Sequence, residues 1–580
     1  MKEEVINTDI WNLLETGKNY NRMQTLYEQA EDNYDQYHGR QWKNLKKPKS
    51  AGEPIVLNII KPIVKNKINT VNESSYEIVF NPNTYETEEE LESLRAVAKG
   101  LTQFIMRMWE KSQSGKKVRS IVKNSCITSE GIIYFFNEDD NIKSEEVYKN
   151  NIYYGNENDS DIQNQPYILA TFRRTVKEVR EKARKYKEVN KNELTDDEIK
   201  NIVSDMDYWE ETSKDKRVVE VSPMCTVVRK FERKEDGKIW ISESTRTCEI
   251  LKEQSTECEL YPFAHYVWED EVGYARGVSE ISFIIDNQRA INKIATRRDI
   301  ATTIGAYPKL VADTSVVKNP QALNQVGSTV ELNGMRADDV NKVVSYLRPV
   351  SMSADAYNLQ QDLIQGTKEL LGAGDVALGN VNPEQASGKA ILAVMNASKQ
   401  PLNEQVENFK YFLEDCAKII LDIIKAYYID GITLYTTTDE INDLGQTEQI
   451  ETPFKITQEE LEKLDLNLKI DITPQSAYDK YAQEMSLENL LIKGMITLEE
   501  YAEALPEDST MPKPTLESII RKRQEKRNKI AQMQQEMNAY DSAIKQEIAM
   551  MGGDTSEMSS MQASGNASGE NITEQNNPQM

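Results

Sequence analysis

Histidine and paired cysteine are scarce in this sequence. It has two histidines in 580 residues, His38 and His265, so we expect neither a histidine-based catalytic triad nor a polyhistidine metal centre. The cysteines are scattered and form no C-x-x-C pair, which favours buried free thiols over disulfides or a zinc site. These absences disfavour catalysis, and we predict no cofactor and no metal. The five cysteines are Cys126, Cys225, Cys248, Cys258 and Cys416.

The sequence also lacks a long apolar run. No stretch approaches the roughly 20 apolar residues that cross a bilayer, and the opening MKEEVINTDIW does not resemble a secretion signal. With a mean hydropathy of -0.64, we expect a soluble protein of a cytoplasm with no membrane partner. Basic residues are in deficit, 70 against 95 acidic ones, giving a net charge of -25. A protein that grips DNA phosphates carries the opposite charge, so any contact with DNA must be loose or local.

The first half of the chain has the pattern of an α+β body. Helical periodicity predicts an opening helix over residues 9–42 that breaks at Gly39, a helix over 54–71 with Pro62 early or at a kink, and a helix over 88–109. Runs rich in β-branched and aromatic residues predict strands of a mixed sheet, and Asp236-Gly237 marks a hairpin turn. The strand segments are SYEIVFNP, GIIYFFNEDD, VYKNNIYYG, PYILATFRR, RVVEVSPMCTVVRKFER and KIWISESTR.

The second half alternates long helices with turn-rich segments. Helices are expected over residues 278–303 and 353–371, on either side of a short-stranded block. Residues 372–388 contain four glycines and one proline, which predicts a flexible loop. An apolar stripe then continues from Ile391 to Tyr427 through Pro401, about 60 Å of helix if unbroken.

The last part of the chain is expected to return to two strands and then to become helical. The strands are ITLYTTTD and LNLKIDITP, and short helices follow near residues 477–491 and 498–504. In a final long helix Ile530, Met533, Met537, Tyr540 and Ile544 recur at 3,4 spacing, which predicts packing between helices of the same or of different subunits. From Gly552 onward the composition predicts disorder.

Several motifs in this order resemble the portal proteins of tailed bacteriophages. YHGRQW followed by EPIVLNIIKPIVKNKINTV looks like the N-terminal signature of that family, and NIYYGNENDSDIQNQPYILATFRRTVKEVREKARKY is similar to its wing segment. PFAHYVWEDEVGYARGVSEISFIIDNQRAINKIATRRD looks like the entry into the first stem helix, and YPKLVAD like the first clip strand. The resemblance covers roughly residues 30 to 435, and the colinear order of the motifs carries it.

The resemblance implies an α+β portal fold with a mixed-sheet wing, a helical stem, a small α/β clip, a long wing helix and a helical crown. Its segments would be the N-terminal wing (1–277), first stem helix (278–304), clip (305–350), second stem helix (351–371), tunnel loop (372–388), returning wing (389–474), crown (475–551) and a disordered tail (552–580).

The family resemblance also implies function and partners. The chain would form a homo-oligomeric ring, with twelve subunits expected, at one capsid vertex, and double-stranded DNA would pass through it independently of sequence during packaging and ejection. Major capsid protein, scaffolding protein, the large terminase subunit and neck or adaptor proteins would be its protein partners. It would lie in the virion, and in the host cytoplasm during assembly.

Three groups of residues become candidates for these contacts. The tunnel loop offers Gly374, Gly379, Asn380, Asn382 and Gln385, whose glycines permit unusual backbone conformations and whose amides offer neutral hydrogen bonds to phosphates. On the first stem helix Lys293, Arg297 and Arg298 either touch DNA from the channel wall or pair with acidic groups of the neighbouring subunit. In the clip, the candidate contacts with terminase or adaptor are Lys309, Asp313, Arg336 and Asp338.

Other chemical interpretations are weaker. ASGKAI resembles a phosphate-binding loop, but Pro383 stands where the first glycine is required and Ala390 where serine or threonine must bind magnesium. His265 lies among aromatic residues, which favours a packed structural role. The rival functions are a nucleic-acid-processing ATPase and another virion structural protein, such as a minor capsid or neck protein.

Overall fold

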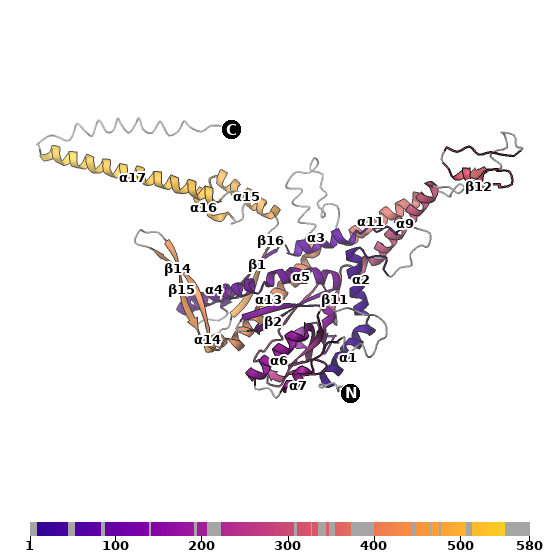
Figure 1. Ribbon diagram of the computed structural model, residues 1–580. Helices are drawn as coiled ribbons and strands as arrows, with labels where there is room; N and C mark the ends of the chain where they lie inside the picture. The colour runs from indigo at the N-terminus through magenta and orange to yellow at the C-terminus, as the bar shows by residue number, and fades with distance from the viewer. Residues whose placement is uncertain are drawn as a thin grey trace. The chain divides into compact units, whose positions relative to one another are not determined.

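The computed structural model describes residues 8–43, 53–72, 74–82, 88–138, 141–190, 194–205, 222–306, 310–325, 327–333, 344–346, 354–372, 399–441, 447–463, 466–474, 477–505 and 513–550. The chain forms two compact units, Met1–Pro474 and Gln475–Met580. Helices and several small sheets alternate along the chain (Figure 1), which confirms the α+β class.

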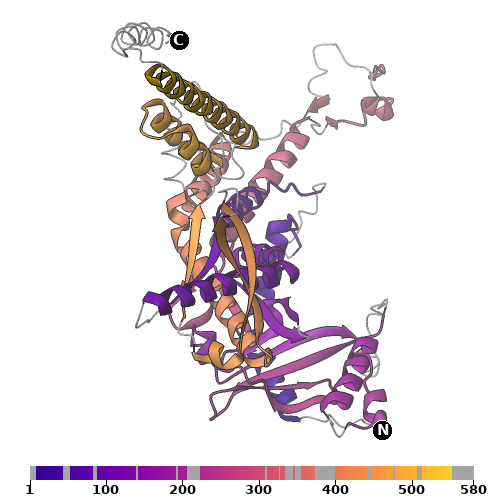
Figure 2. The same cartoon turned by 90° about the vertical axis from the view of Figure 1, so that its left-hand side faces the viewer.

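Two antiparallel sheets form the lower part of the first unit in Figure 2. The five-stranded sheet has the order β4-β5-β6-β7-β8, and the three-stranded sheet has the order β3-β2-β9. The hairpin turn predicted at Asp236-Gly237 is confirmed, because it joins β6 to β7 and Gly237 has a φ of 78°. The strands are β2 (Glu130–Glu138), β3 (Asn141–Val147), β4 (Ile152–Tyr154), β5 (Tyr167–Thr175), β6 (Met224–Arg233), β7 (Ile239–Ser244), β8 (Glu249–Ser255) and β9 (Phe263–Val267). The predicted strand VYKNNIYYG is interrupted by the 3-10 helix η1 (Lys149–Asn151).

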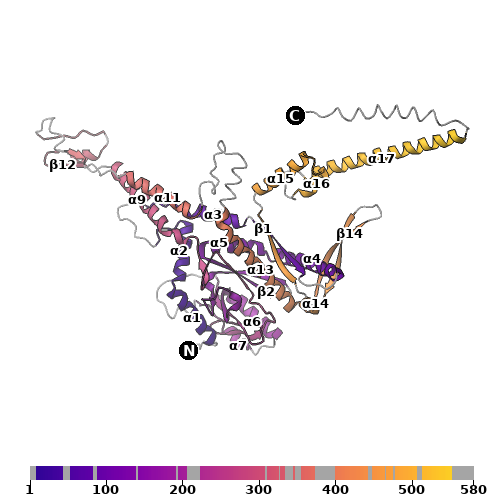
Figure 3. The ribbon, with the colours of Figure 1, turned by 180° about the vertical axis from the view of Figure 1, so that it is seen from behind.

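The main apolar core lies between β2 and β9 and the helices that pack against them. Tyr266 of β9 meets Phe409 and Phe412 of α13, with ring centroids 5.9 and 5.7 Å apart. All five cysteines are buried, as predicted. The core helices are α3 (Ile60–Asn72), α4 (Glu88–Lys111), α5 (Ser114–Thr128) and α13 (Asn403–Tyr427), and Figures 1 and 3 show α5 and α13 beside β2. A smaller satellite core lies where α6 (Val176–Asn190) and α7 (Asp196–Lys200) cover the five-stranded sheet.

The opening helix predicted over residues 9–42 is two helices, α1 (Thr8–Met23) and α2 (Leu26–His38). The break falls at Thr25, which has a φ of 56°, a left-handed conformation that a continuous helix excludes. The predicted end at Gly39 is confirmed, because this glycine has a φ of 82° and its N–H bonds back to the carbonyl of Gln36.

The helix predicted over residues 54–71 begins later, as α3 at Ile60. Pro62 is its third residue, where a missing N–H costs nothing. Residues 53–59 have no helical structure. Their backbone N–H groups donate to side chains of another helix instead, as described below.

Two further antiparallel pairs of strands complete the first unit. β1 (Ser74–Pro82) pairs antiparallel with β16 (Leu466–Pro474) over nine residues, joining parts of the chain far apart in sequence. β14 (Ile432–Ile441) and β15 (Thr447–Ile456) form a long hairpin against α4. The approach is close, because a Cβ at Gly100 would lie 2.9 Å from the Cβ of Leu434.

The apolar stripe predicted to run through Pro401 is interrupted there. Gln400–Leu402 is a 3-10 helix, and α13 begins at Asn403. Pro401 has no N–H to donate and therefore stands at a helix start, not within one. A 25-residue helix remains.

The second unit is helical. α15 (Ala477–Ile492), α16 (Leu498–Ala504) and α17 (Lys513–Met550) match the three predicted helices. Thr497 caps α16 by accepting from the N–H of Glu500, whose carboxylate accepts from the N–H of Thr497.

Candidate functional site

The sequence pointed to a pair of helices with a small module between them, and the structure brings the pair together. α9 (Ile285–Ala306) and α11 (Ala354–Leu370) lie side by side in Figure 1. Asn287 donates to Thr367 at 3.2 Å near one end, and Arg298 donates to Gln360 at 2.6 Å near the other. These contacts pair the start of one helix with the end of its partner, so the two form an antiparallel hairpin.

A buried polar stripe on α9 holds the extended segment 53–59. Gln288, Asn292 and Thr296 stand four residues apart on one face, and all three are at most 2% exposed. They accept hydrogen bonds from the backbone N–H groups of Ile59 (3.1 Å), Leu57 (2.9 Å) and Ile55 (3.1 Å) respectively.

In an extended chain the N–H groups of alternate residues point the same way. Each of the three N–H groups therefore meets one polar side chain from successive turns of α9. Gln288 also donates to the Leu57 carbonyl at 2.6 Å, and Asn292 donates to Gln41. The stripe thus replaces a strand partner, which is why the segment is extended and not helical. Sequence reasoning missed it, because α9 contains many other polar residues and the i, i+4, i+8 spacing of these three does not set them apart.

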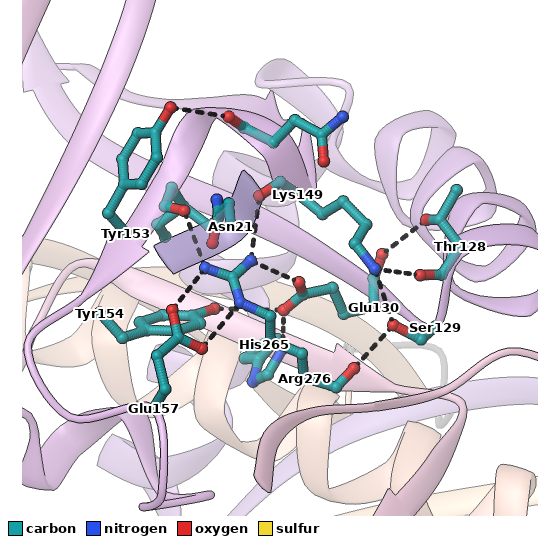
Figure 4. A network of polar contacts seen from close by, with 12 residues as sticks. Asn21, Thr128, Ser129, Glu130, Lys149, Tyr153, Tyr154, Glu157, His265 and Arg276 are labelled. Carbon is teal, nitrogen blue, oxygen red and sulfur yellow. Dashed lines mark hydrogen bonds and ion pairs between the residues drawn. The ribbon is translucent and has the colours of Figure 1, made fainter. Parts of the chain in front are cut away.

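The root of the hairpin is fixed by a buried charge network (Figure 4). β11 (Tyr274–Val278) leads into α9 through the 3-10 helix Ser282–Ile284, and its Arg276 is 1% exposed. The guanidinium donates to the carboxylates of Glu130 (2.9 Å) and Glu157 (2.8 Å), and to the carbonyls of Lys149 (3.1 Å) and Ile152 (3.1 Å).

Glu130 is the central carboxylate of this network. Burial alone raises its pKa, but the charge of Arg276 and the hydrogen bond with His265, 2.8 Å away, together lower the pKa to about 2. Burial lowers the pKa of Lys149 to about 8, although Glu130 acts in the opposite direction. His265 therefore contacts a buried carboxylate within a fixed network, which matches the packed role expected from its sequence context.

A second buried ion pair lies just before α9. Lys67 of α3 donates to Glu280 at 2.6 Å, and the indole N–H of Trp268 donates to the other oxygen of the same carboxylate at 2.8 Å. Lys67 and Glu280 are 8% and 7% exposed. Strands β9 and β11 and helix α3 therefore all meet where the hairpin leaves the body.

The three basic residues predicted on the first helix differ in their surroundings. Arg298 contacts the partner helix, since besides Gln360 its guanidinium lies 4.8 Å from the ring centroid of Tyr357. Lys293 and Arg297 are exposed, and neither forms an ion pair with any residue that the structure describes. They stand four residues apart on a face away from the polar stripe.

The module between the two helices contains short strands, as predicted. β12 (Leu310–Ala312) pairs with β13 (Val344–Tyr346), and Val317 and Leu332 form an isolated bridge. Asp313 is exposed and accepts from the hydroxyl of Ser315 at 2.6 Å and from its N–H at 2.9 Å, which lowers the pKa of Asp313. In this chain it caps a turn.

The other predicted site residues lie outside the described part of the chain. These are the loop residues Gly374, Gly379, Asn380, Asn382 and Gln385 and the module residues Lys309, Arg336 and Asp338. The described residues end just inside that loop at Gly372, which follows α11 with a φ of 61°.

Two searches of the described residues bear on chemistry and location. They contain no group of three or more histidine, cysteine, aspartate or glutamate side chains placed to hold a metal ion. None of the helices among them is long and apolar enough to span a membrane.

The model of the phage P22-like portal protein family matches residues 16–568 of this sequence, nearly its whole length. The chain belongs to this family. The resemblance found from the sequence motifs is therefore confirmed and extends beyond residue 435 to the helical C-terminal unit. A search of curated proteins found no match. The portal family consists of structural phage proteins of the capsid vertex that act in DNA packaging, and this protein is one of them.

Proposed function

We propose that this portal protein assembles into a ring of about twelve subunits and forms the channel through which double-stranded DNA enters and leaves the capsid. The observation that carries the proposal is the family match over residues 16–568. A closed ring requires heterologous interfaces, in which one face of each subunit meets a different face of the next. The role is structural, and no catalytic step is assigned to this chain.

In this proposal the α9–α11 hairpin is the stem. Large apolar side chains lie exposed along it: Ile304 (48%), Leu359 (52%) and Leu370 (63%), with Phe283 (53%) just before α9. Apolar area of this kind is what a persistent subunit interface covers. The buried network at the hairpin root would hold each copy at the same angle, which a closed ring demands.

The remaining segments follow the order of the family. Residues 1–277 and 389–474 would form the wing, 305–350 the clip, 475–551 the crown and 552–580 a tail that lies outside the described residues. The clip would face outward and bind the large terminase subunit and later the neck or adaptor proteins. Major capsid and scaffolding proteins would surround the ring at the vertex, in the host cytoplasm during assembly and afterwards in the virion.

Lys293 and Arg297 are the stem candidates for contact with DNA. Both are exposed and without an ion-pair partner among the described residues, whereas Arg298 is engaged with α11. Two cations per subunit in a chain of net charge -25 would touch phosphates without holding them, so the duplex could slide. A ring that retained linear DNA tightly at physiological salt would contradict this part of the proposal.

Residues 372–388 would form the tunnel loop that narrows the channel. Their glycines allow adjustment as a helical duplex passes a ring of different symmetry, and Asn380, Asn382 and Gln385 offer hydrogen bonds that do not read sequence. Deleting residues 376–382 should leave rings and proheads intact while packaging or DNA retention falls. Wild-type packaging and retention would mean that the loop only connects two helices.

Electron microscopy of the purified protein tests the main proposal. Rings with a central hole are expected, and their rotational symmetry gives the subunit number. A protein that stays monomeric at high concentration, or that forms open filaments, would favour another kind of virion structural protein. An ATPase remains disfavoured because ASGKAI lacks the residues of a phosphate loop.

A further inference from the structure

The long helix α17 carries a band of positive charge in an otherwise acidic protein. Residues 513–529 contain seven basic and two acidic residues, a net charge of +5, whereas the whole chain carries -25. Lys522, Arg523, Lys526, Arg527 and Lys529 are all exposed. None of these five side chains forms an ion pair with a residue that the structure describes.

Helix α6 is also rich in basic residues, but several of its basic side chains have partners within the chain. Lys182 of α6 pairs with Glu243 at 2.7 Å, and Lys187 pairs with Asp196 at 2.8 Å. Arg180 donates to the carbonyl of Ile202 at 2.7 Å. The cations of α6 that point inward are therefore neutralised or bonded within the chain, whereas the five α17 side chains named above form no ion pair with a described residue.

The position of the band on the helix adds a second observation. The apolar stripe of α17 is exposed, with Ile530 at 57%, Met533 at 67%, Met537 at 65% and Tyr540 at 70%. Counting back from Ile530 in the same 4,3 steps reaches Lys526 and Arg523, and then Ile519 at 40% exposed. The basic residues thus interrupt the stripe on its own face.

This interruption makes it electrostatically unfavourable for the band itself to pack against its own copies. If α17 helices of neighbouring subunits packed along the stripe, the apolar part would be covered, but Arg523 and Lys526 would bring like charges of several copies together. The five cations lie within about 10 Å along the helix. Neighbouring charges are therefore closer than the ~8 Å screening length, so salt does not remove their mutual repulsion. A polyanion would neutralise these charges, whereas another copy of the band would add to the repulsion.

We propose that the α17 band, residues 522–529, binds the phosphate backbone of duplex DNA without sequence preference. Duplex DNA presents one negative charge per ~1.7 Å of its axis, a density that matches a compact row of lysines and arginines. Both residue types contact phosphates through charge and N–H donors and need no particular base. The inference rests on the proposed channel function, since it assigns a contact for the DNA that the ring would conduct.

The test compares two triple variants of the full-length protein. Arg523→Gln, Lys526→Gln and Arg527→Gln remove three charges from the band. Lys177→Gln, Arg184→Gln and Lys185→Gln remove three exposed charges from α6 and serve as the matched control. Binding of a fluorescently labelled duplex is followed by anisotropy over a range of salt concentrations, and rings are counted by microscopy in the same samples.

We expect the α17 triple variant to lower the slope of log K against log salt by about 2 to 3, because each phosphate contact contributes about 0.9. The α6 control should keep the wild-type slope. Replacing Arg523 and Arg527 by lysine keeps the charge and should also keep the slope.

Equal slopes for the α17 variant and the wild type would overturn the proposal. So would loss of rings in the α17 variant alone, since the cations would then act between subunits, and so would tighter binding of an acidic protein than of DNA. Failure of the wild type to form rings is a separate result that contradicts the proposed function and leaves the slope comparison readable.

Discussion

Arg276 and Arg523 are the same residue type in very different surroundings. Arg276 is 1% exposed and donates five hydrogen bonds to two carboxylates and two carbonyls. Arg523 is exposed and has no ion-pair partner among the described residues. The first arginine completes its contacts within one chain, and the second leaves its charge open to solvent and to other molecules. Regions of the first kind hold the subunit's own elements together, and regions of the second kind are where we propose that partners bind.

The largest expected effect on the unfolding free energy comes from replacing the buried Arg276. Arg276→Met leaves Glu130 and Glu157 without their main counter-charge, and breaking a buried ion pair in this way costs about 3 to 5 kcal/mol. Arg523→Met is the matched control and should stay within about 0.5 kcal/mol. Urea unfolding followed by fluorescence measures both variants. Equal midpoints for the two would mean that Arg276 is not the anchor of the hairpin root.

Acid should weaken the same network in a defined range of pH. The pKa of Glu130 is lowered to about 2 from 4.5, so the folded state holds its carboxylate charged where the unfolded state takes up a proton. This contribution to stability is complete above about pH 4.5 and is lost as the pH falls towards 2.

Glu130→Gln should therefore flatten the fall in unfolding free energy between pH 4.5 and pH 2, by on the order of 3 kcal/mol. Other carboxylates titrate in both proteins, so the comparison isolates this one. Parallel pH profiles for the two proteins would show that Glu130 has an ordinary pKa.

A smaller and more local effect is expected from the polar stripe. Asn292→Ala removes the acceptor for the N–H of Leu57 and leaves that group unpaired, at a cost of about 1 to 3 kcal/mol. The amide of Leu57 should then exchange its hydrogen about 5 to 150 times faster, if exchange proceeds through local opening. The control is Lys293→Ala, one residue further on and exposed. Unchanged exchange at Leu57 in Asn292→Ala would indicate that the segment is held by other contacts.

The sequence predicted regular elements well where neighbouring residues decide them. The turn at Asp236-Gly237, the end of α2 at Gly39 and the span of α11 all follow from local periodicity and glycine conformation. The break at Thr25 did not follow, because no residue type there demands a positive φ.

Long-range contacts explain the other misses. Residues 54–59 belong to a predicted helix, but Gln288, Asn292 and Thr296, over 200 positions away, hold this segment extended. The same applies to the predicted wall residues, since the partner of Arg298 lies on α11 and is found only once the two helices are packed. Family resemblance supplied the function, and it carries no information on which cations remain unpaired.

The smallest effect in the single chain is expected at the exposed stripe of α17. Met537 is 65% exposed, so Met537→Ala should change the unfolding free energy of the dilute monomer by less than about 0.5 kcal/mol. Phe409→Ala, at a side chain 1% exposed in the core, should cost about 3 to 5 kcal/mol under the same conditions.

The stripe contributes to stability only when another helix covers it, so Met537→Asp should lower the fraction of rings at a protein concentration where the wild type is half assembled. A loss above 1 kcal/mol for Met537→Ala in the monomer would mean that the stripe packs within one chain. Rings unaffected by Met537→Asp would mean that no other helix covers it, and either result would remove the contrast with Arg276.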